Sequence, residues 1–172
     1  DIKDWNFDLV KKNAEDQWNN ELSKIEVASA NKELLSAFYT SLYHTMLAPI
    51  VFNDVNGQYK GVDGNIHLAE NYTKYSIFSL WDTFRAAHPL FTVTQSERVD
   101  DIINSMLSHY NEYGLLPVWE LLGNETGTMI GYHATPVITD AILKGYNGFD
   151  VNLAYDAMRK SAMQNHLGLK YY

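Results

Sequence analysis

Two Trp–acid dipeptides are the strongest chemical candidates in the sequence. Trp81–Asp82 and Trp119–Glu120 each place an indole beside a carboxylate. A pyranose needs an apolar face to stack on and a carboxylate to accept from vicinal hydroxyls, so each pair could form part of a sugar site. A structural interpretation competes with this one. Asp82 and Arg85 have the spacing of an ion pair on a helix surface, and Trp119 could simply anchor its loop to the core.

One further titratable side chain stands near a predicted helix start. His133, in Gly131-Tyr132-His133, could reach a ligand or could only cap the helix that follows, because imidazole serves many roles near neutral pH. The sequence has no His-Glu-x-x-His pattern and no calcium loop, so it predicts no metal site of its own. With no Cys, thiolate zinc sites, iron–sulfur clusters and cysteine nucleophiles are excluded. The available chemistry is therefore that of oxygen and imidazole groups.

Length and charge narrow the classes of protein. The 172 residues are 46% hydrophobic, which fits one globular core or a piece of a larger domain. Thirteen Lys and Arg against twenty-one Asp and Glu leave a net charge of -8, which disfavours a nucleic-acid partner. No apolar run approaches the roughly 20 residues of a membrane-spanning helix. A start without Met favours a segment excised from a longer protein.

Apolar residues recur at three- and four-residue steps over most of the chain, which is typical of amphipathic helices. Asp150 has the position of an N-cap and Gly145 that of a C-cap, while Thr94 and Glu97 have the spacing of a capping box. Pro89 should end or bend the third helix. The predicted helices cover about residues 6–28, 35–46, 77–91, 99–113, 134–144 and 151–165.

Two segments interrupt this helical pattern. Residues 50–67 lose the period and contain Asn56-Gly57 and Asp63-Gly64, which predicts a small hairpin or loop excursion. Residues 115–128 contain Pro117, Gly123 and Gly127 and are predicted to be a structured loop. The fold class is therefore all-α. Antiparallel helical hairpins with long loops on alternating connections suggest about half of a helical toroid, in which such loops surround a ligand cavity.

Several longer motifs occur along the chain, namely Tyr39–Pro49, Tyr59–Gly64, Phe78–Arg85, Trp119–Asn124 and Met129–Ala134. Together they resemble glycoside hydrolase family 92, and the resemblance covers nearly the whole chain. It implies the first part of an (α/α)6-toroid catalytic domain, with an N-terminal β-sandwich and the remainder of the toroid outside residues 1–172. It also implies calcium-dependent, inverting, exo-acting hydrolysis of α-linked mannose from N-glycans or mannans, in the periplasm or at the cell surface.

The resemblance assigns substrate recognition to this chain and catalysis elsewhere. Trp81 and Asp82 match the pair that lines the mannose subsite. The other residues that it proposes for substrate binding are Arg85, Trp119, Glu120 and His133. The general acid, the general base and most Ca2+ ligands are expected outside this segment, because the family's Thr-Glu-Gly-Asn-Ala-Trp-Gln type motif is absent. The isolated chain is therefore expected to lack turnover.

Two other functions stay open from the residues alone. One is a non-catalytic all-α module that binds carbohydrate or another protein. The other is a small complete enzyme that uses Glu120 or Asp82 as its acid. A half toroid would also expose apolar helix faces that normally have partners, so the chain is expected to self-associate.

Overall fold

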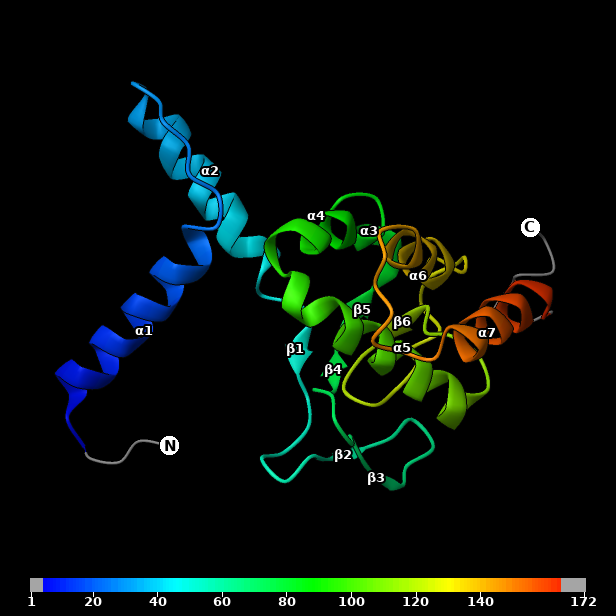
Figure 1. Cartoon of the computed structure of the whole chain (residues 1–172). Helices are drawn as coiled ribbons and strands as arrows, with labels where there is room; N and C mark the ends of the chain where they lie inside the picture. Colours follow the sequence, from blue (N-terminus) through cyan, green and yellow to red (C-terminus); the bar gives the residue numbers. More distant parts are fainter. Residues whose placement is uncertain (1–4, 165–172) are drawn as a thin grey trace. The chain divides into compact units, whose positions relative to one another are not determined.

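The computed structural model describes residues 5–164, which belong to two compact units, Asp1–Leu47 and Ala48–Tyr172. Most of the regular structure in the described residues is helical, and the strands are two or three residues long (Figure 1). The all-α class is therefore confirmed, and the succession of helices agrees with part of an (α/α)6 toroid. Within residues 5–164, no helix is both long and apolar enough to cross a membrane.

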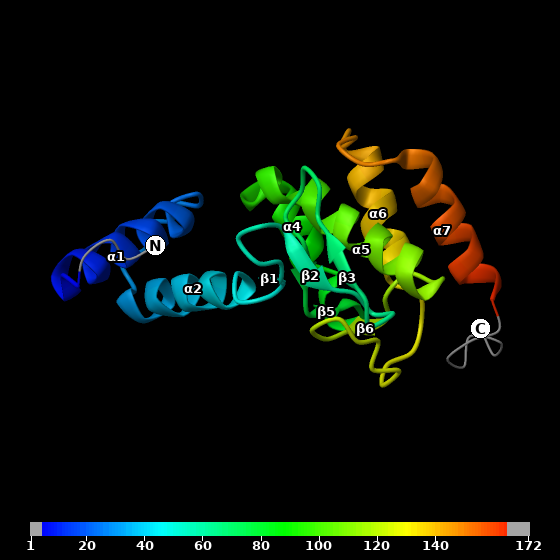
Figure 2. The ribbon, with the colours of Figure 1, turned by 90° about the horizontal axis from the view of Figure 1, so that it is seen from below.

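The first unit is a helical hairpin made of α1 (Phe7–Leu22) and α2 (Lys32–Thr45). Asparagine caps both helices: the Asn6 side chain accepts from the Leu9 N–H, and Asn31 does the same for the start of α2. The rings of Trp18 and Tyr43 meet edge to face at 4.7 Å between the two helices. Figure 2 shows the two helices side by side.

The first helix ends earlier than the predicted residue 28. After Leu22 the chain turns, and the Tyr39 hydroxyl forms hydrogen bonds with backbone groups that would bond within the helix if the helix were longer. It donates to the Ile25 carbonyl (3.3 Å) and accepts from the Val27 N–H (3.4 Å). A side chain on the partner helix thus competes with helix continuation, which the periodicity of this segment alone does not reveal.

The core of the second unit surrounds α5 (Val99–Tyr113), with α4 (Ala87–Thr94), α6 (Ala134–Leu143) and α7 (Val151–Met163) packed around it. Figure 2 shows α6 and α7 running next to each other. Large side chains that are almost completely buried fill the centre of this unit. They are Phe78, Leu80, Ile103, Met106 and Ile138.

The predicted caps of the last two helices are confirmed. The Asp150 side chain accepts from the Asn152 and Leu153 N–H groups at the start of α7. After α6, Gly145 has a φ of +92° and the Tyr146 N–H donates back to the Ala141 carbonyl at 3.1 Å, as in a Schellman motif. The predicted end of the last helix at residue 165 lies outside the described residues.

In the described part of the second unit, short strands form three two-stranded antiparallel sheets. The predicted hairpin is confirmed as β2 (Gln58–Lys60) paired with β3 (Ile66–Leu68). Two other pairings were not predicted: β1 (Ile50–Val51) with β4 (Tyr75–Ser76), and β5 (Phe78–Ser79) with β6 (Trp119–Glu120). The last pairing ties the long loop before α6 to the segment that precedes α3 (Leu80–Thr83).

The single helix predicted over residues 77–91 is wrong. This segment contains β5, the short helix α3 and then α4. Pro89 does not end the helix but lies in the first turn of α4, where its missing N–H costs nothing because that N–H would have no partner within the helix. The helical spacing of apolar residues conceals the break, since β5 and α4 both direct apolar side chains to the same core.

The capping box predicted at Thr94 is also wrong. Thr94 is the last residue of α4, and its hydroxyl donates to the Leu90 carbonyl at 3.1 Å. A short 3-10 helix, η1 (Ser96–Arg98), follows and leads into α5. The helix predicted over residues 99–113 is confirmed as α5, whose buried face includes Val99, Ile103 and Met106. α5 ends at Tyr113, and Gly114 follows it with a φ of +91°.

Candidate functional site

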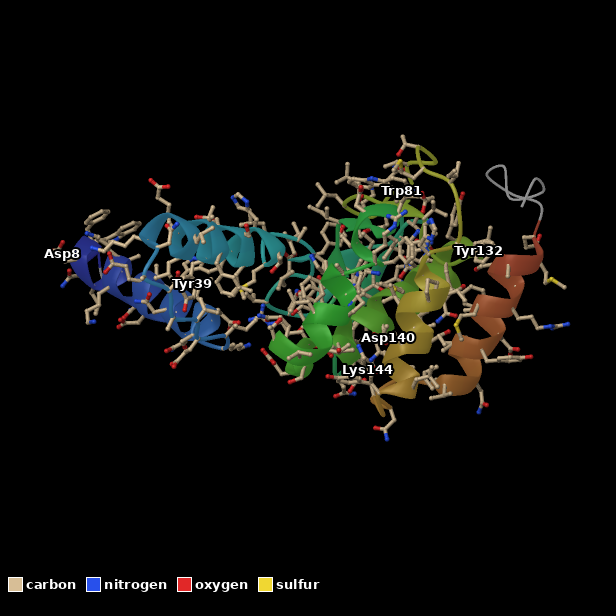
Figure 3. All side chains as sticks on the ribbon, turned by 90° about the horizontal axis from the view of Figure 1, so that it is seen from above. Asp8, Tyr39, Trp81, Tyr132, Asp140 and Lys144 are labelled. Carbon is tan, nitrogen blue, oxygen red and sulfur yellow. The ribbon has the colours of Figure 1, made fainter. Side chains whose placement is uncertain are left out.

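The pairing of β5 with β6 brings the two Trp–acid dipeptides together. In the register of this ladder, Phe78 lies opposite Glu120 and Ser79 lies opposite Trp119. Because α3 begins directly after Ser79, Trp81 and Asp82 lie within three residues of the strand that pairs with Trp119. Figure 3 shows Trp81 close to the loop that leads into α6, in which Tyr132 is labelled.

Trp81 belongs to a stack of aromatic rings around one guanidinium group. The Arg85 guanidinium carbon lies 4.6 Å from the Trp81 ring centroid and 4.6 Å from that of Phe84. On Phe84, in turn, the His133 ring stacks at 4.3 Å with an interplanar angle of 7°. Three of the residues proposed from the sequence, Trp81, Arg85 and His133, therefore share one cluster, with Phe84 as the member that the sequence analysis missed.

The electrostatics of this cluster favour a neutral imidazole. Burial lowers the pKa of His133, and the positive charge of Arg85 lowers it further. A neutral histidine offers one hydrogen-bond donor and one acceptor, so His133 can meet a hydroxyl in either role. The positive charge in the stack is that of Arg85, whose Nη1 donates to the Trp81 carbonyl at 2.6 Å.

Asp82 and Arg85 do not form the ion pair that their spacing allows. The Asp82 carboxylate accepts a hydrogen bond from the Ser79 hydroxyl at the start of α3, while Arg85 bonds to the Trp81 backbone and lies against its ring. The helix is only four residues long, and the competing aromatic faces hold the guanidinium away from the acid. Both Asp82 and Trp81 are exposed, with 38% of Trp81 accessible, so a ligand can reach an indole and a carboxylate together.

Glu120 has a different environment from Asp82, although both follow a tryptophan. Only 2% of Glu120 is exposed. Its carboxylate accepts from the Ser76 hydroxyl (2.9 Å), the Ile77 N–H (3.1 Å) and the Gly123 N–H (2.7 Å). Burial raises the pKa of Glu120, and these donors oppose that shift. The Glu120 oxygens are therefore enclosed and occupied by internal donors, whereas Asp82 is exposed.

A second buried carboxylate shapes the same loop. Glu125 accepts from the Val118 N–H (2.8 Å), the Trp119 N–H (3.1 Å) and the Gly127 N–H (3.1 Å). Its side chain is 2% exposed. Trp119 directly precedes Glu120 in the sequence and is half-buried, and its backbone is held both by the β5–β6 pairing and by Glu125. The structured loop predicted over residues 115–128 is confirmed, and carboxylate-to-backbone hydrogen bonds are what give it structure.

A buried lysine acts on the electrostatics of Glu120. Lys74 donates to the Ser105 carbonyl (3.1 Å) and to the Ser108 hydroxyl (2.6 Å), and its side chain is enclosed by the core. Burial lowers the pKa of Lys74, while the negative charges of Glu112 and Glu120 act in the opposite direction. Lys74 thus partly compensates the charge of Glu120 without forming a close ion pair with it.

Comparison with known proteins assigns the chain to a family. The family model described as the glycosyl hydrolase family 92 catalytic domain matches residues 1–172. The chain belongs to glycosyl hydrolase family 92. The resemblance inferred from the motifs is therefore confirmed. A search of curated proteins finds no match to this family 92 chain.

Solved structures of family 92 proteins match nearly the whole chain. The GH92 alpha-mannosidase BT3965 from Bacteroides thetaiotaomicron is 44% identical, with a TM-score of 0.91 over 99% of this chain and 23% of its own. BT3965 has also been solved in complex with mannoimidazole. The GH92 inverting mannosidase BT2199 from Bacteroides thetaiotaomicron VPI-5482 is 34% identical, with a TM-score of 0.88 over 99% of this chain and 24% of its own. The chain thus spans about a quarter of the length of these relatives.

The site of this family 92 chain includes residues that the sequence analysis did not select. Phe84 bridges Arg85 and His133, Ser79 holds Asp82, and Glu125 shapes the loop around Trp119. Glu125 gave one usable signal, a glutamate in a Gly-rich loop that already contains Glu120. Among residues 5–164, no group of three or more His, Asp or Glu side chains could hold a metal ion.

Proposed function

We propose that this chain is part of an exo-acting α-mannosidase and that its Trp81–Asp82 face contributes to the mannose-binding subsite. The observation that carries the proposal is the exposed Trp81–Asp82 pair, held beside Trp119 by the β5–β6 ladder. Membership of family 92 supports the reaction class, and the mannoimidazole complex of BT3965 supports a mannose-like ligand.

Each residue of this face has a chemical task in the proposal. The Trp81 indole stacks on the apolar face of the sugar, and the Asp82 carboxylate accepts from its hydroxyls. Trp119 borders the subsite from the loop. Arg85 orients Trp81 through the ring contact and the bond to its carbonyl, and His133 offers a neutral imidazole to a further hydroxyl.

The acid and the base of the reaction belong, in this proposal, to other segments of the protein. Inverting hydrolysis needs a carboxylic acid and a carboxylate roughly 6.5–9.5 Å apart, with water between the base and the sugar. Asp82 is the exposed acid of the face described here, while Glu120 and Glu125 are committed to backbone donors. The missing partners lie in the rest of the toroid and the N-terminal β-sandwich, which the proposal places outside residues 1–172. The short span of this chain relative to BT3965 supports that arrangement.

Calcium dependence is part of the proposal for the intact protein. The described residues do not fit a Ca2+ ion on their own, because Ca2+ takes 6–8 oxygen ligands and residues 5–164 gather no suitable acidic cluster. The ion would therefore be held mostly by residues outside this chain, and none of the tasks assigned above depends on it.

The test is mannose release from α-1,2-linked mannobiose by the intact protein and by this 172-residue chain, each with Ca2+ and with a chelator. We expect turnover only in the intact protein. There, Asp82→Ala should lower kcat/KM at least about tenfold, since a charged hydrogen bond contributes roughly 1.5–3 kcal/mol. Asp156→Ala, an exposed acid on α7, is the matched control and should leave the kinetics unchanged.

Three outcomes would contradict the proposal. Unchanged kinetics in a folded Asp82→Ala variant would remove Asp82 from the subsite. Turnover by the isolated chain would mean that it contains both acid and base. Sugar binding without turnover in the intact protein would favour the non-catalytic carbohydrate-binding module instead.

We also propose that the isolated chain self-associates. Large apolar side chains are exposed in both units, and such surfaces attract other apolar surfaces. Light scattering should therefore give a mass above the 19.7 kDa of one chain. A strictly monomeric species at micromolar concentration would refute this. The most exposed of these side chains are Trp5, Phe7, Leu34, Val55, Ile66, Val93, Leu143 and Met163.

A further inference from the structure

We propose that Glu120 is a positioning residue: its buried carboxylate, bridged by the Ser76 hydroxyl, sets the direction of β5 and thereby presents Trp81 and Asp82 to the sugar. The inference rests on the proposed function for the identity of the ligand. Its structural part, that Glu120 orients α3, stands on the hydrogen bonds described above and can be tested separately.

The first step is the conformation of Ile77. This residue lies between β4, which pairs with β1, and β5, which pairs with β6, so the chain changes sheets there. Its φ is +70°, which is a strained value for a β-branched residue. The Ile77 N–H takes part in neither ladder and instead donates to Glu120 Oε2 at 3.1 Å. Glu120 therefore supplies the acceptor that makes this turn tolerable.

The second step connects that turn with the exposed pair. Only Phe78 and Ser79 separate Ile77 from α3, and the Ser79 hydroxyl donates to Asp82. Four residues are too few for a helix to be stable by itself, so the direction of α3 depends on the segments at its ends. A change in the Ile77 turn would consequently move Trp81 and Asp82.

The third step concerns the loop on the other side of the carboxylate. The Gly123 N–H donates to Glu120 Oε1 at 2.7 Å, and the Ser76 hydroxyl oxygen accepts from the Leu122 N–H at 2.8 Å while its proton faces Glu120. The turn after Trp119 and the turn before α3 thus share one anchor. Glu120 keeps the two tryptophan-bearing segments in register through groups that the sugar never touches.

A carboxylate is required in this position, and an amide of the same shape is not equivalent. One Glu120 oxygen faces the Gly123 N–H and the other faces the Ile77 N–H. In Glu120→Gln, the amide NH2 must stand against one of these two donors, whichever way the side chain is turned. The variant keeps the volume but loses one of the two backbone anchors.

The experiment compares Glu120→Gln with Ser161→Ala in the intact protein. Ser161 is a matched control because its buried hydroxyl accepts from one loop N–H, that of Leu116 (2.9 Å), without touching Ile77 or Gly123. Hydrogen exchange is read at the Phe84 amide, which donates to the Leu80 carbonyl (3.0 Å) and so reports on α3. Mannoimidazole affinity and the mannobiose kinetics are measured in parallel.

We expect Glu120→Gln to exchange the Phe84 amide about tenfold faster and to bind mannoimidazole about tenfold more weakly, with KM changed more than kcat. Ser161→Ala should change neither reading. If Glu120→Gln does not fold, Ser76→Ala replaces it, because it keeps the carboxylate and removes only the bridge.

An unchanged Phe84 exchange rate in a folded variant would overturn the inference. Faster exchange combined with unchanged mannoimidazole affinity would also overturn it, because α3 would then move without consequence for the ligand. If the unmodified intact protein neither binds mannoimidazole nor releases mannose, the proposed function fails. The exchange result still decides whether Glu120 orients α3.

Discussion

Adding one methyl group at Gly123 tests how closely the loop after Trp119 packs on β2. A Cβ at this position would lie 2.6 Å from the Lys60 carbonyl oxygen and 3.4 Å from the Phe52 ring. Gly123 also has a φ of +73°, which disfavours any L-residue. Gly64 is the matched control, because its φ is +82° and an added Cβ meets nothing within 4 Å.

The two substitutions share one cost and differ in another. An alanine in the left-handed region costs roughly 1–2 kcal/mol, part of which is offset because the unfolded chain loses freedom. Gly64→Ala should therefore lower the free energy of unfolding by about 1 kcal/mol. Gly123→Ala adds a clash with backbone, and overpacking costs roughly 1–3 kcal/mol more. We expect a total loss of about 3 kcal/mol for Gly123→Ala.

Urea unfolding of the second unit measures the difference. When Trp5 and Trp18 are replaced by Phe, indole fluorescence reports only on Trp81 and Trp119. At a urea m-value of about 2 kcal/mol/M, Gly123→Ala should unfold about 1 M below Gly64→Ala. Equal midpoints for the two variants would refute the reasoning, because the loop would then have room to move away from β2.

Three other predictions follow from the caps and the histidines. Burial lowers the pKa of His88 and of His109 to about 4. The unfolded chain therefore binds more protons than the folded chain between about pH 6.5 and 4. As the pH is lowered through this window, the free energy of unfolding should fall by about 3 kcal/mol per histidine. Urea midpoints at pH 7, 5 and 4 check this, and a pH-independent midpoint would contradict it. Asp150→Ala removes the N-cap of α7 and should cost about 1 kcal/mol in the same assay, whereas no loss would mean that the cap is dispensable. Arg85→Gln removes a positive charge beside His133 and should raise the pKa of His133, as followed by NMR of the imidazole; an unchanged pKa would place the guanidinium elsewhere in solution.

Local interactions explain the parts of the fold that were predicted correctly. They include the helix over residues 99–113, the N-cap at Asp150 and the C-cap at Gly145, which all depend on residues within one or two helical turns. Their energetics are contained in a short window of sequence, so periodicity and cap chemistry suffice to find them.

The errors occurred where distant residues compete with local preference. The Tyr39 hydroxyl forms hydrogen bonds with backbone groups after α1. Residues 78–79 pair with β6, although a helix was predicted to begin at residue 77. Thr94 has capping spacing, yet its hydroxyl bonds within the preceding helix. For the first two, the hydrogen-bonding partner is distant in the sequence. For Thr94, the partner precedes it in the chain, whereas the capping-box pattern considers only the residues that follow.

The sequence by itself determined that this is a largely helical chain with two Trp–acid motifs and, through longer motifs, its membership of family 92. Only the tertiary structure decided which acid of the two motifs is free. Asp82 is exposed beside Trp81, whereas Glu120 is enclosed by the Ser76 hydroxyl and by the N–H groups of Ile77 and Gly123. The physical reason is that accessibility and hydrogen-bond satisfaction depend on groups brought together by β5 and β6, and neither property belongs to a dipeptide alone.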